Sequence, residues 1–150
     1  MSTRRSDRLA GVERTGKSVE DHLASLKGDR GDEIRRLDAA ITEHMPGHAR
    51  HLYEGKMWGG TDQTIIGYGI MDHRNRSGED VEWFVVGLAA QKRYISMYVN
   101  VVVDGAYLLR EYDGRLGKVK LGSASLGFDD LADVDFENLM DLVARAGESV

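Results

Sequence analysis

The sequence predicts an α+β domain in which an antiparallel β-sheet carries an N-terminal helical hairpin and a C-terminal helix on one face. Apolar residues recur at helical spacing in residues 18–45 and again after residue 133, whereas residues 64–103 are rich in β-branched and aromatic residues. Because the predicted strands follow one another without long helices between them, the sheet is expected to be antiparallel, with the helices on one side of it.

The N-terminal hairpin is predicted from two amphipathic segments. The first helix is expected to begin after Ser18, whose hydroxyl can cap it, with Asp21 as a variant of the capping box. The second helix follows the break at residues 27–32, "KGDRGD", and ends at Pro46-Gly47. The apolar stripes consist of Val19, Leu23 and Leu26 in the first helix and Ile34, Leu37, Ile41 and Met45 in the second.

Three strands are predicted in the middle of the chain, at residues 64–71, 81–89 and 93–103, with a polar hairpin loop between the first two. In the third strand, core residues alternate with a half-polar aromatic face. These two sets are Ile95, Met97, Val99 and Val101 for the core and Tyr94, Ser96, Tyr98 and Asn100 for the other face. The half-polar face could also serve as a homodimer surface.

The last third is expected to contain a short helix at residues 105–112, a loop leading into a strand within residues 118–128, and a final helix. This helix begins near Asp133 or Asp135, either of which can complement its N-terminus. Its apolar stripe consists of Phe136, Leu139, Met140 and Val143.

Length and composition favour a single domain, residues 18–150, preceded by a disordered basic tail, residues 1–17. The sequence has no cysteine, which excludes disulfides and zinc–cysteine sites within the chain. It also lacks an apolar run of about 18 residues, so we expect no membrane segment and a cytoplasmic location. Its net charge is −5 and the basic excess lies in the tail, so a nucleic-acid partner is not expected.

One motif suggests a nucleotide hydrolase. Residues 11–18, "GVERTGKS", match a phosphate-binding loop, and residues 101–105, "VVVDG", resemble the strand that ends in a magnesium-binding Asp in such enzymes. A phosphate-binding loop follows a buried strand, and residues 1–10 contain three arginines and no such strand. We therefore reject this interpretation and expect Ser18 to be a helix cap, Lys17 to be solvated, and Asp104-Gly105 to form a turn.

A groove around Trp58 is one candidate binding site. Lys56 and Trp58 could form its lip, with Tyr94 and Tyr98 of the third strand as walls. A cation beside aromatic rings suits a small anion or a peptide. The alternative is that Trp58 belongs to the core.

Carboxylates form a second candidate site. Glu20, Asp21, Asp32 and Glu33 in the helical hairpin could hold a hard divalent cation weakly through their oxygens. A further acidic group surrounds the start of the last helix and comprises Asp129, Asp130, Asp133, Asp135 and Glu137. The alternative is a solvated acidic face that also complements a helix dipole.

Histidines and a glutamate near the end of the hairpin could also ligate a metal; they are His44, His48, His51 and Glu54. Pro46-Gly47 interrupts the helix between the first two, so no regular helical spacing links them. We therefore interpret these residues as part of a solvated connection between helix and strand.

Several motifs in fixed order resemble the bacterial YdhG-like family, a domain of unknown function, over roughly residues 18–147. These matches are Met57-Trp58-Gly59, Trp83-Phe84, Lys92, Tyr98 and Leu116-Gly117-Lys118. Gly122 is also kept, but Ser123 stands where the family has a second Lys, and Ala124-Ser125 where it has Ser-Cys. The connection after Met57-Trp58-Gly59 is longer here, with "GTDQT" in it.

The resemblance implies a fold similar to frataxin and, in some members, an intracellular iron chaperone for iron–sulfur cluster and haem assembly. It therefore implies weak binding of Fe(II) by surface carboxylates and an assembly-protein partner. It also adds Lys92 and Gly122 to the candidate ligand groove.

Two hypotheses follow. The first is a non-enzymatic, iron-binding protein that uses Glu20, Asp21, Asp32 and Glu33. The second is a binding module for a small anion or peptide that uses the groove of Lys56, Trp58, Lys92, Tyr94, Tyr98 and Gly122. No catalytic constellation is visible, so we do not expect an enzyme.

Overall fold

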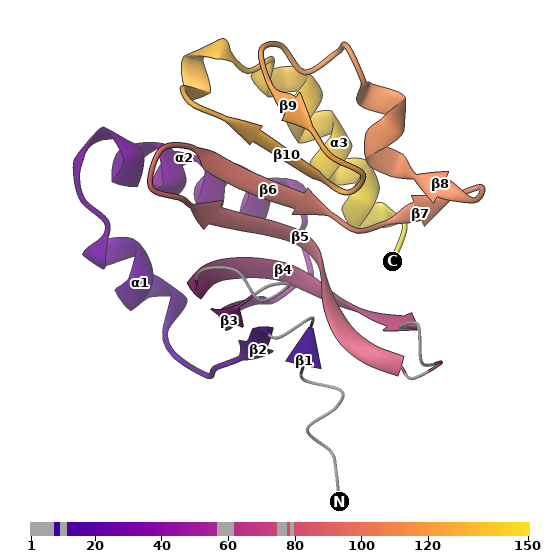
Figure 1. Cartoon of the computed structure of the whole chain (residues 1–150), viewed down its shortest axis with the longest axis horizontal. Helices are drawn as coiled ribbons and strands as arrows, with labels where there is room; N and C mark the ends of the chain where they lie inside the picture. The colour runs from indigo at the N-terminus through magenta and orange to yellow at the C-terminus, as the bar shows by residue number, and fades with distance from the viewer. Residues whose placement is uncertain (1–7, 10–11, 57–61, 75–77, 79) are drawn as a thin grey trace, which may run out of the picture.

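The computed structural model describes residues 8–9, 12–56, 62–74, 78 and 80–150. Within this part of the chain an antiparallel sheet of eight strands has the order β1-β2-β3-β4-β5-β6-β10-β9, and a separate hairpin pairs β7 with β8 (Figure 1). The main-sheet strands are β1 (Arg8–Leu9), β2 (Val12–Arg14), β3 (Arg50–Lys56), β4 (Asp62–Arg74), β5 (Asp80–Ala90), β6 (Ile95–Val99), β9 (Lys120–Leu121) and β10 (Ser125–Phe128). The small hairpin consists of β7 (Val102–Val103) and β8 (Ala106–Tyr107).

Three α-helices accompany the sheet: α1 (Val19–Ser25), α2 (Gly28–His44) and α3 (Phe136–Glu148). The predicted caps are confirmed, because Ser18 accepts a hydrogen bond from the Asp21 amide and Asp135 accepts one from the Asn138 amide. The sheet and these helices confirm the α+β class, the helical hairpin and the C-terminal helix. No helix in the described part of the chain is both long and apolar enough to span a bilayer.

Some predicted boundaries are wrong. The helical hairpin breaks only at Leu26 and Lys27, and "GDRGD" already belongs to α2. The strand predicted at 93–103 ends at Val99, and Asp104-Gly105 forms the turn between β7 and β8 with positive φ angles of 53° and 84°. Residues 105–112 are not one helix, because β8 precedes a 3₁₀ turn, Leu108–Tyr112.

Three strands are missing from the prediction. Within the predicted disordered tail, residues 8–9 form β1 and residues 12–14 form β2, which pairs with β3, and Val12 is fully buried. Residues 50–56 were interpreted as a solvated connection, but they form β3 between β2 and β4. Cross-strand pairing on both sides compensates for the weak local preference of these segments.

The apolar core has two parts on opposite faces of the sheet. The larger part receives side chains from all three helices, among them Leu23, Ile34 and Leu142, together with one face of the sheet. The smaller part contains Val12, Tyr53, Ile65, Val81, Phe84 and Ala89. Because β1 also contacts β5, the N-terminal strands curl towards the side of the sheet that the helices leave open.

Paired glycines make room for the smaller core. Gly67 on β4 and Gly87 on β5 lie directly opposite each other. A Cβ atom at Gly67 would come within 2.4 Å of the Tyr53 ring, and one at Gly87 within 2.5 Å of the Phe84 ring. The two aromatic rings therefore occupy the space that a side chain at position 67 or 87 would need.

Candidate functional site

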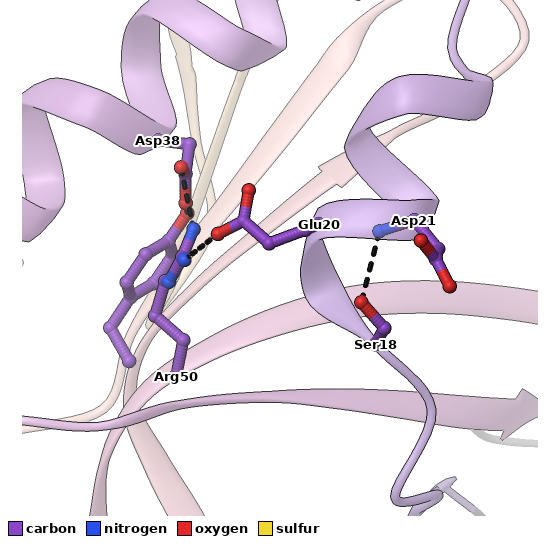
Figure 2. A network of polar contacts seen from close by, with 6 residues as sticks. Ser18, Glu20, Asp21, Asp38 and Arg50 are labelled. Atoms are coloured by element: carbon purple, nitrogen blue, oxygen red, sulfur yellow. Dashed lines mark hydrogen bonds and ion pairs between the residues drawn. The ribbon is translucent and has the colours of Figure 1, made fainter.

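Three of the four carboxylates predicted to bind a metal have separate partners. Glu20 pairs with Arg50, Asp32 pairs with Arg35 at 2.8 Å, and Glu33 accepts a 3.1 Å hydrogen bond from the Leu131 amide. In Figure 2 the side chain of Asp21 points away from Glu20. Over the described residues, no group of three or more His, Cys, Asp or Glu side chains is placed to hold a metal ion.

Glu20 instead belongs to a polar network between α1, α2 and the sheet (Figure 2). Asp38, which is only 7% exposed, accepts 2.7 Å hydrogen bonds from Arg50 Nη1 and from the Tyr68 hydroxyl. Burial, together with Asp38, raises the pKa of Tyr68 well above its ordinary value. Each group has a partner and the network spans helix and sheet, so its chemistry is that of a structural anchor.

The histidines are also dispersed. A ring nitrogen of His44 lies 2.8 Å from the Ala40 carbonyl oxygen, and one of His48 lies 2.9 Å from that of Gly147. His51 lies on β3, where burial is the main cause that lowers its pKa and Arg14 adds to the effect. These side chains do not converge on one point.

The phosphate-loop pattern forms no phosphate cradle. The strand β2 lies inside the motif rather than before it, and Ser18 caps α1. Lys17 is exposed, as predicted, and donates a 2.9 Å hydrogen bond to Glu54. A cradle would need the strand, the turn and the helix in that order.

Aromatic rings gather on the face of the sheet opposite the helices. The buried ring of Phe84 lies at the centre, with ring centroids of Tyr53 at 5.2 Å, Trp83 at 5.4 Å and Tyr98 at 6.1 Å. Tyr53 donates a 2.9 Å hydrogen bond to buried Glu82, which also pairs with Arg14 at 3.1 Å. Trp83 and Tyr98 are only partly buried, so they form the accessible margin of the cluster.

Polar side chains from β4, β6 and the connection between β5 and β6 adjoin this margin. Gln91 donates hydrogen bonds to Gln63 at 2.7 Å and to Ser96 at 3.4 Å. Tyr98 lies two residues after Ser96 on β6 and so projects from the same face. Tyr94 lies in the turn before β6, and its ring reaches this face over Gly127, the residue opposite Ser96.

A lysine joins the same face through the strand register. Ser96 lies opposite Gly127, and Gly127 lies opposite Lys120 on the edge strand β9. Directly opposite residues project to the same side of a sheet, and two strand spacings measure about 10 Å. The Tyr94 ring fills the space over Gly127, 3.3 Å from where a Cβ atom would stand, and so lies between Ser96 and Lys120. We call the set Gln63, Gln91, Tyr94, Ser96, Tyr98 and Lys120 the aromatic–amide face.

The residues predicted to form a groove around Trp58 are divided by this arrangement. Trp58 lies outside the described residues. Tyr94 and Tyr98 share one face, and Lys92 lies in the turn before β6, close to Tyr94 in the chain. Lys56 is at the end of β3, opposite Asp62. Gly122 lies at the other end, because its amide bonds to Ser125, which pairs with Tyr98 rather than with the Lys92 end of β6.

A separate cavity of about 830 Å³ lies beside α3, near the C-terminal end of α2. It is lined by His44, Arg115, Phe136, Glu137, Asn138, Met140, Asp141 and Ala144. Beside it, the buried Tyr112 donates a 2.5 Å hydrogen bond to Asp141 and accepts one of 3.1 Å from Arg145. Phe136 and Met140 belong to the predicted core stripe of the last helix, which is confirmed: Met140 is 3% exposed and Phe136 packs against the core.

Comparisons with protein-family models, with curated proteins and with solved structures found no match. The YdhG-like resemblance and the frataxin-like assignment therefore stay predictions, and the candidate sites rest on the geometry of this chain.

Proposed function

We propose that this protein is a non-enzymatic binding module and that the aromatic–amide face is its ligand surface. The observation that carries the proposal is the position of Ser96, between Tyr94 and Tyr98 in the chain and beside the Gln91–Gln63 amide pair. Gly127, covered by the Tyr94 ring, separates it from Lys120. Aromatic side chains with a few converging polar groups are typical of ligand sites.

The side chains favour a small organic anion with a planar body, such as an aromatic carboxylate or the carboxylate end of a peptide. Lys120 supplies a positive charge, and Gln91, whose amide binds Gln63 and the buried Ser96, supplies hydrogen-bonding groups. Tyr94, which is 44% exposed, supplies a ring on which a planar group can stack. Burial is the main cause that raises the pKa of Tyr98, so its phenol stays neutral near pH 7 and does not repel an anion.

The iron-chaperone hypothesis has less support from the contacts of its candidate ligands. Glu20 and Glu33 are engaged by Arg50 and by the Leu131 amide. A hard divalent cation requires several oxygen ligands in one place. We therefore rank ferrous iron second to an organic anion.

Nuclear magnetic resonance titration of the labelled chain with benzoate and with N-acetyltyrosine tests the proposal. We expect amide shifts at residues 94–98, 120 and 127 with a Kd of about 1 mM, which is typical of ligands this small. Lys120→Gln should weaken binding about threefold, because an exposed ion contact is worth up to ~1 kcal/mol.

Lys118→Gln is the matched control, since it removes the same charge from an exposed lysine two residues away. Equal weakening by the two variants would reduce the effect to overall charge. If neither probe shifts these amides at about 10 mM, an excess over the Kd expected here, the proposed ligand class is wrong.

A further inference from the structure

The strands β1 and β2, residues 8–9 and 12–14, lie at one edge of the sheet, and we call them the strap. β2 pairs with β3 through three residues, β1 pairs with β2 through two, and β1 also contacts β5. Val12 of the strap is fully buried in the smaller core. The strap therefore covers the Tyr53 end of the aromatic cluster, whereas the aromatic–amide face lies at its Tyr98 end.

An ion pair holds the strap against the sheet. Arg14 Nη2 lies 3.1 Å from the carboxylate of Glu82 on β5, which also accepts a 2.9 Å hydrogen bond from the Tyr53 hydroxyl. Arg14 lies directly opposite Tyr53 in the strand register, so the two side chains project to the same side of the sheet. Because the Glu82 side chain is only 10% exposed, solvent screens this pair less than it screens a surface pair.

The charge of His51 acts on this ion pair. His51 lies two residues before Tyr53 on β3 and is thus the diagonal neighbour of Arg14 on the same side, at about 7–8 Å. Its opposite residue on β4 is Gly67, over which the Tyr53 ring lies. Among the described residues, Arg14 on β2 and Glu82 on β5 are therefore the charged groups that face it. A protonated His51 repels Arg14 and competes with it for Glu82.

Gly16 provides a hinge at the base of the strap. Its φ angle is 80°, and nothing lies within 4 Å of the place that a Cβ atom would take. The residue before it, Thr15, donates a 2.9 Å hydrogen bond from its amide to the Leu52 carbonyl, and Ser18 after it caps α1. Rotation at Gly16 thus releases the strap while the helix cap stays in place.

We propose that the strap is a pH-sensitive cover of the smaller core, which opens in mild acid when His51 becomes charged beside the Arg14–Glu82 pair. Once Arg14 has moved away, the charged imidazole faces water and Glu82 alone, so the open form binds the proton more tightly than the closed form. The closed strap is therefore favoured at neutral pH and the open strap as the pH falls. Opening leaves the edge of β3 unpaired, and it does not depend on a ligand at the aromatic–amide face.

Amide hydrogen exchange of the whole chain tests the proposal. The protection factor, which is the intrinsic exchange rate divided by the observed rate, removes the direct effect of pH. Thr15 reports the strap, and Leu139 in α3 reports global unfolding. We expect Thr15 to be protected at least about tenfold less than Leu139, and its protection to fall at least about threefold from pH 7.5 to pH 5. This fall should disappear in His51→Gln and persist in the control His44→Gln.

A second pair of variants tests the ion pair. Arg14→Gln should lower the protection of Thr15 about fivefold at pH 7.5, whereas Lys118→Gln, which removes a cation next to β9 at the opposite edge of the sheet, should leave it unchanged. If Thr15 is as protected as Leu139, the strap opens only with the whole domain and the proposal is wrong. A pH effect on Thr15 that persists in His51→Gln, or equal protection in Arg14→Gln and the wild type, would also overturn it.

Discussion

The carboxylate of Asp38 on α2 accepts a 2.7 Å hydrogen bond from the hydroxyl of Tyr68 on β4, and so joins the longest helix of the hairpin to the sheet. Arg50 on β3 binds the second oxygen of the same carboxylate and also reaches Glu20 on α1 (Figure 2). Four elements therefore meet at one buried acid.

Replacement of Asp38 should lower the free energy of unfolding. Asp38→Ala leaves the Tyr68 hydroxyl and one face of Arg50 without a partner, so we expect a loss of about 2–3 kcal/mol in the free energy of unfolding. Tyr68→Phe should cost about 1 kcal/mol, and Glu20→Gln less than ~1 kcal/mol because Glu20 is largely exposed. Urea denaturation of the three variants measures this order, and a loss for Glu20→Gln as large as that for Asp38→Ala would contradict it.

The paired glycines of the sheet give a second prediction. Gly67→Ala places a Cβ atom 2.4 Å from the Tyr53 ring, so the aromatic cluster must shift, and we expect a loss of about 2–3 kcal/mol. Gly114→Ala is the control, since its Cβ meets open space and its positive φ alone costs about 1 kcal/mol. Urea midpoints compare the stabilities, and the near-ultraviolet circular dichroism should change only for Gly67→Ala.

Local signals in the sequence are sufficient to predict the helices and one turn. The caps at Ser18 and Asp135 are confirmed because a cap acts on an amide only three residues away. The Asp104-Gly105 turn is confirmed for the same reason, since its positive φ angles are a property of two adjacent residues.

Features that depend on distant partners could not be predicted in this way. The strand β3, "RHLYEGK", has one aliphatic residue, Leu52, and owes its conformation to pairing with β2 and β4. Gln63, Gln91 and Lys120 belong to the candidate site only because the register of five neighbouring strands, β4, β5, β6, β10 and β9, brings them near Ser96. No spacing in the sequence encodes that register.

The lowered pKa of His51 predicts a dependence of stability on pH. Burial and Arg14 disfavour the charged imidazole, so the unfolded chain binds a proton more readily than the folded chain. The contribution of neutral His51 to the free energy of unfolding is thus complete above the pKa of about 6.5 that it has in the unfolded chain. It is lost as the pH falls through the lower pKa of His51 in the folded chain. Urea midpoints measured from pH 7.5 to pH 5 should fall less steeply for His51→Gln than for the wild type.

A second histidine variant and one comparison variant accompany this measurement. His22, whose pKa burial also lowers, should contribute a slope of the same sign, so His22→Gln should flatten the profile as well. His44→Gln serves as the comparison, because its ring lies against the Ala40 carbonyl rather than beside Arg14. A pH profile for His51→Gln that parallels that of the wild type would show that folding does not lower the pKa of His51.

The metal hypothesis is decided by anaerobic thermal unfolding with ferrous iron and with magnesium. Specific binding raises the free energy of unfolding by about 2.7 kcal/mol at a hundredfold excess over Kd. Because Glu20, Asp32 and Glu33 have separate partners, we expect iron to raise Tm no more than magnesium does. A larger rise with iron, lost in Asp21→Asn/Asp32→Asn but kept in the control Asp104→Asn/Asp113→Asn, would instead establish an iron site on the helical hairpin. Glu20 is left unchanged in these variants, since its loss would also disturb Arg50 and thereby confuse a change in stability with a change in binding.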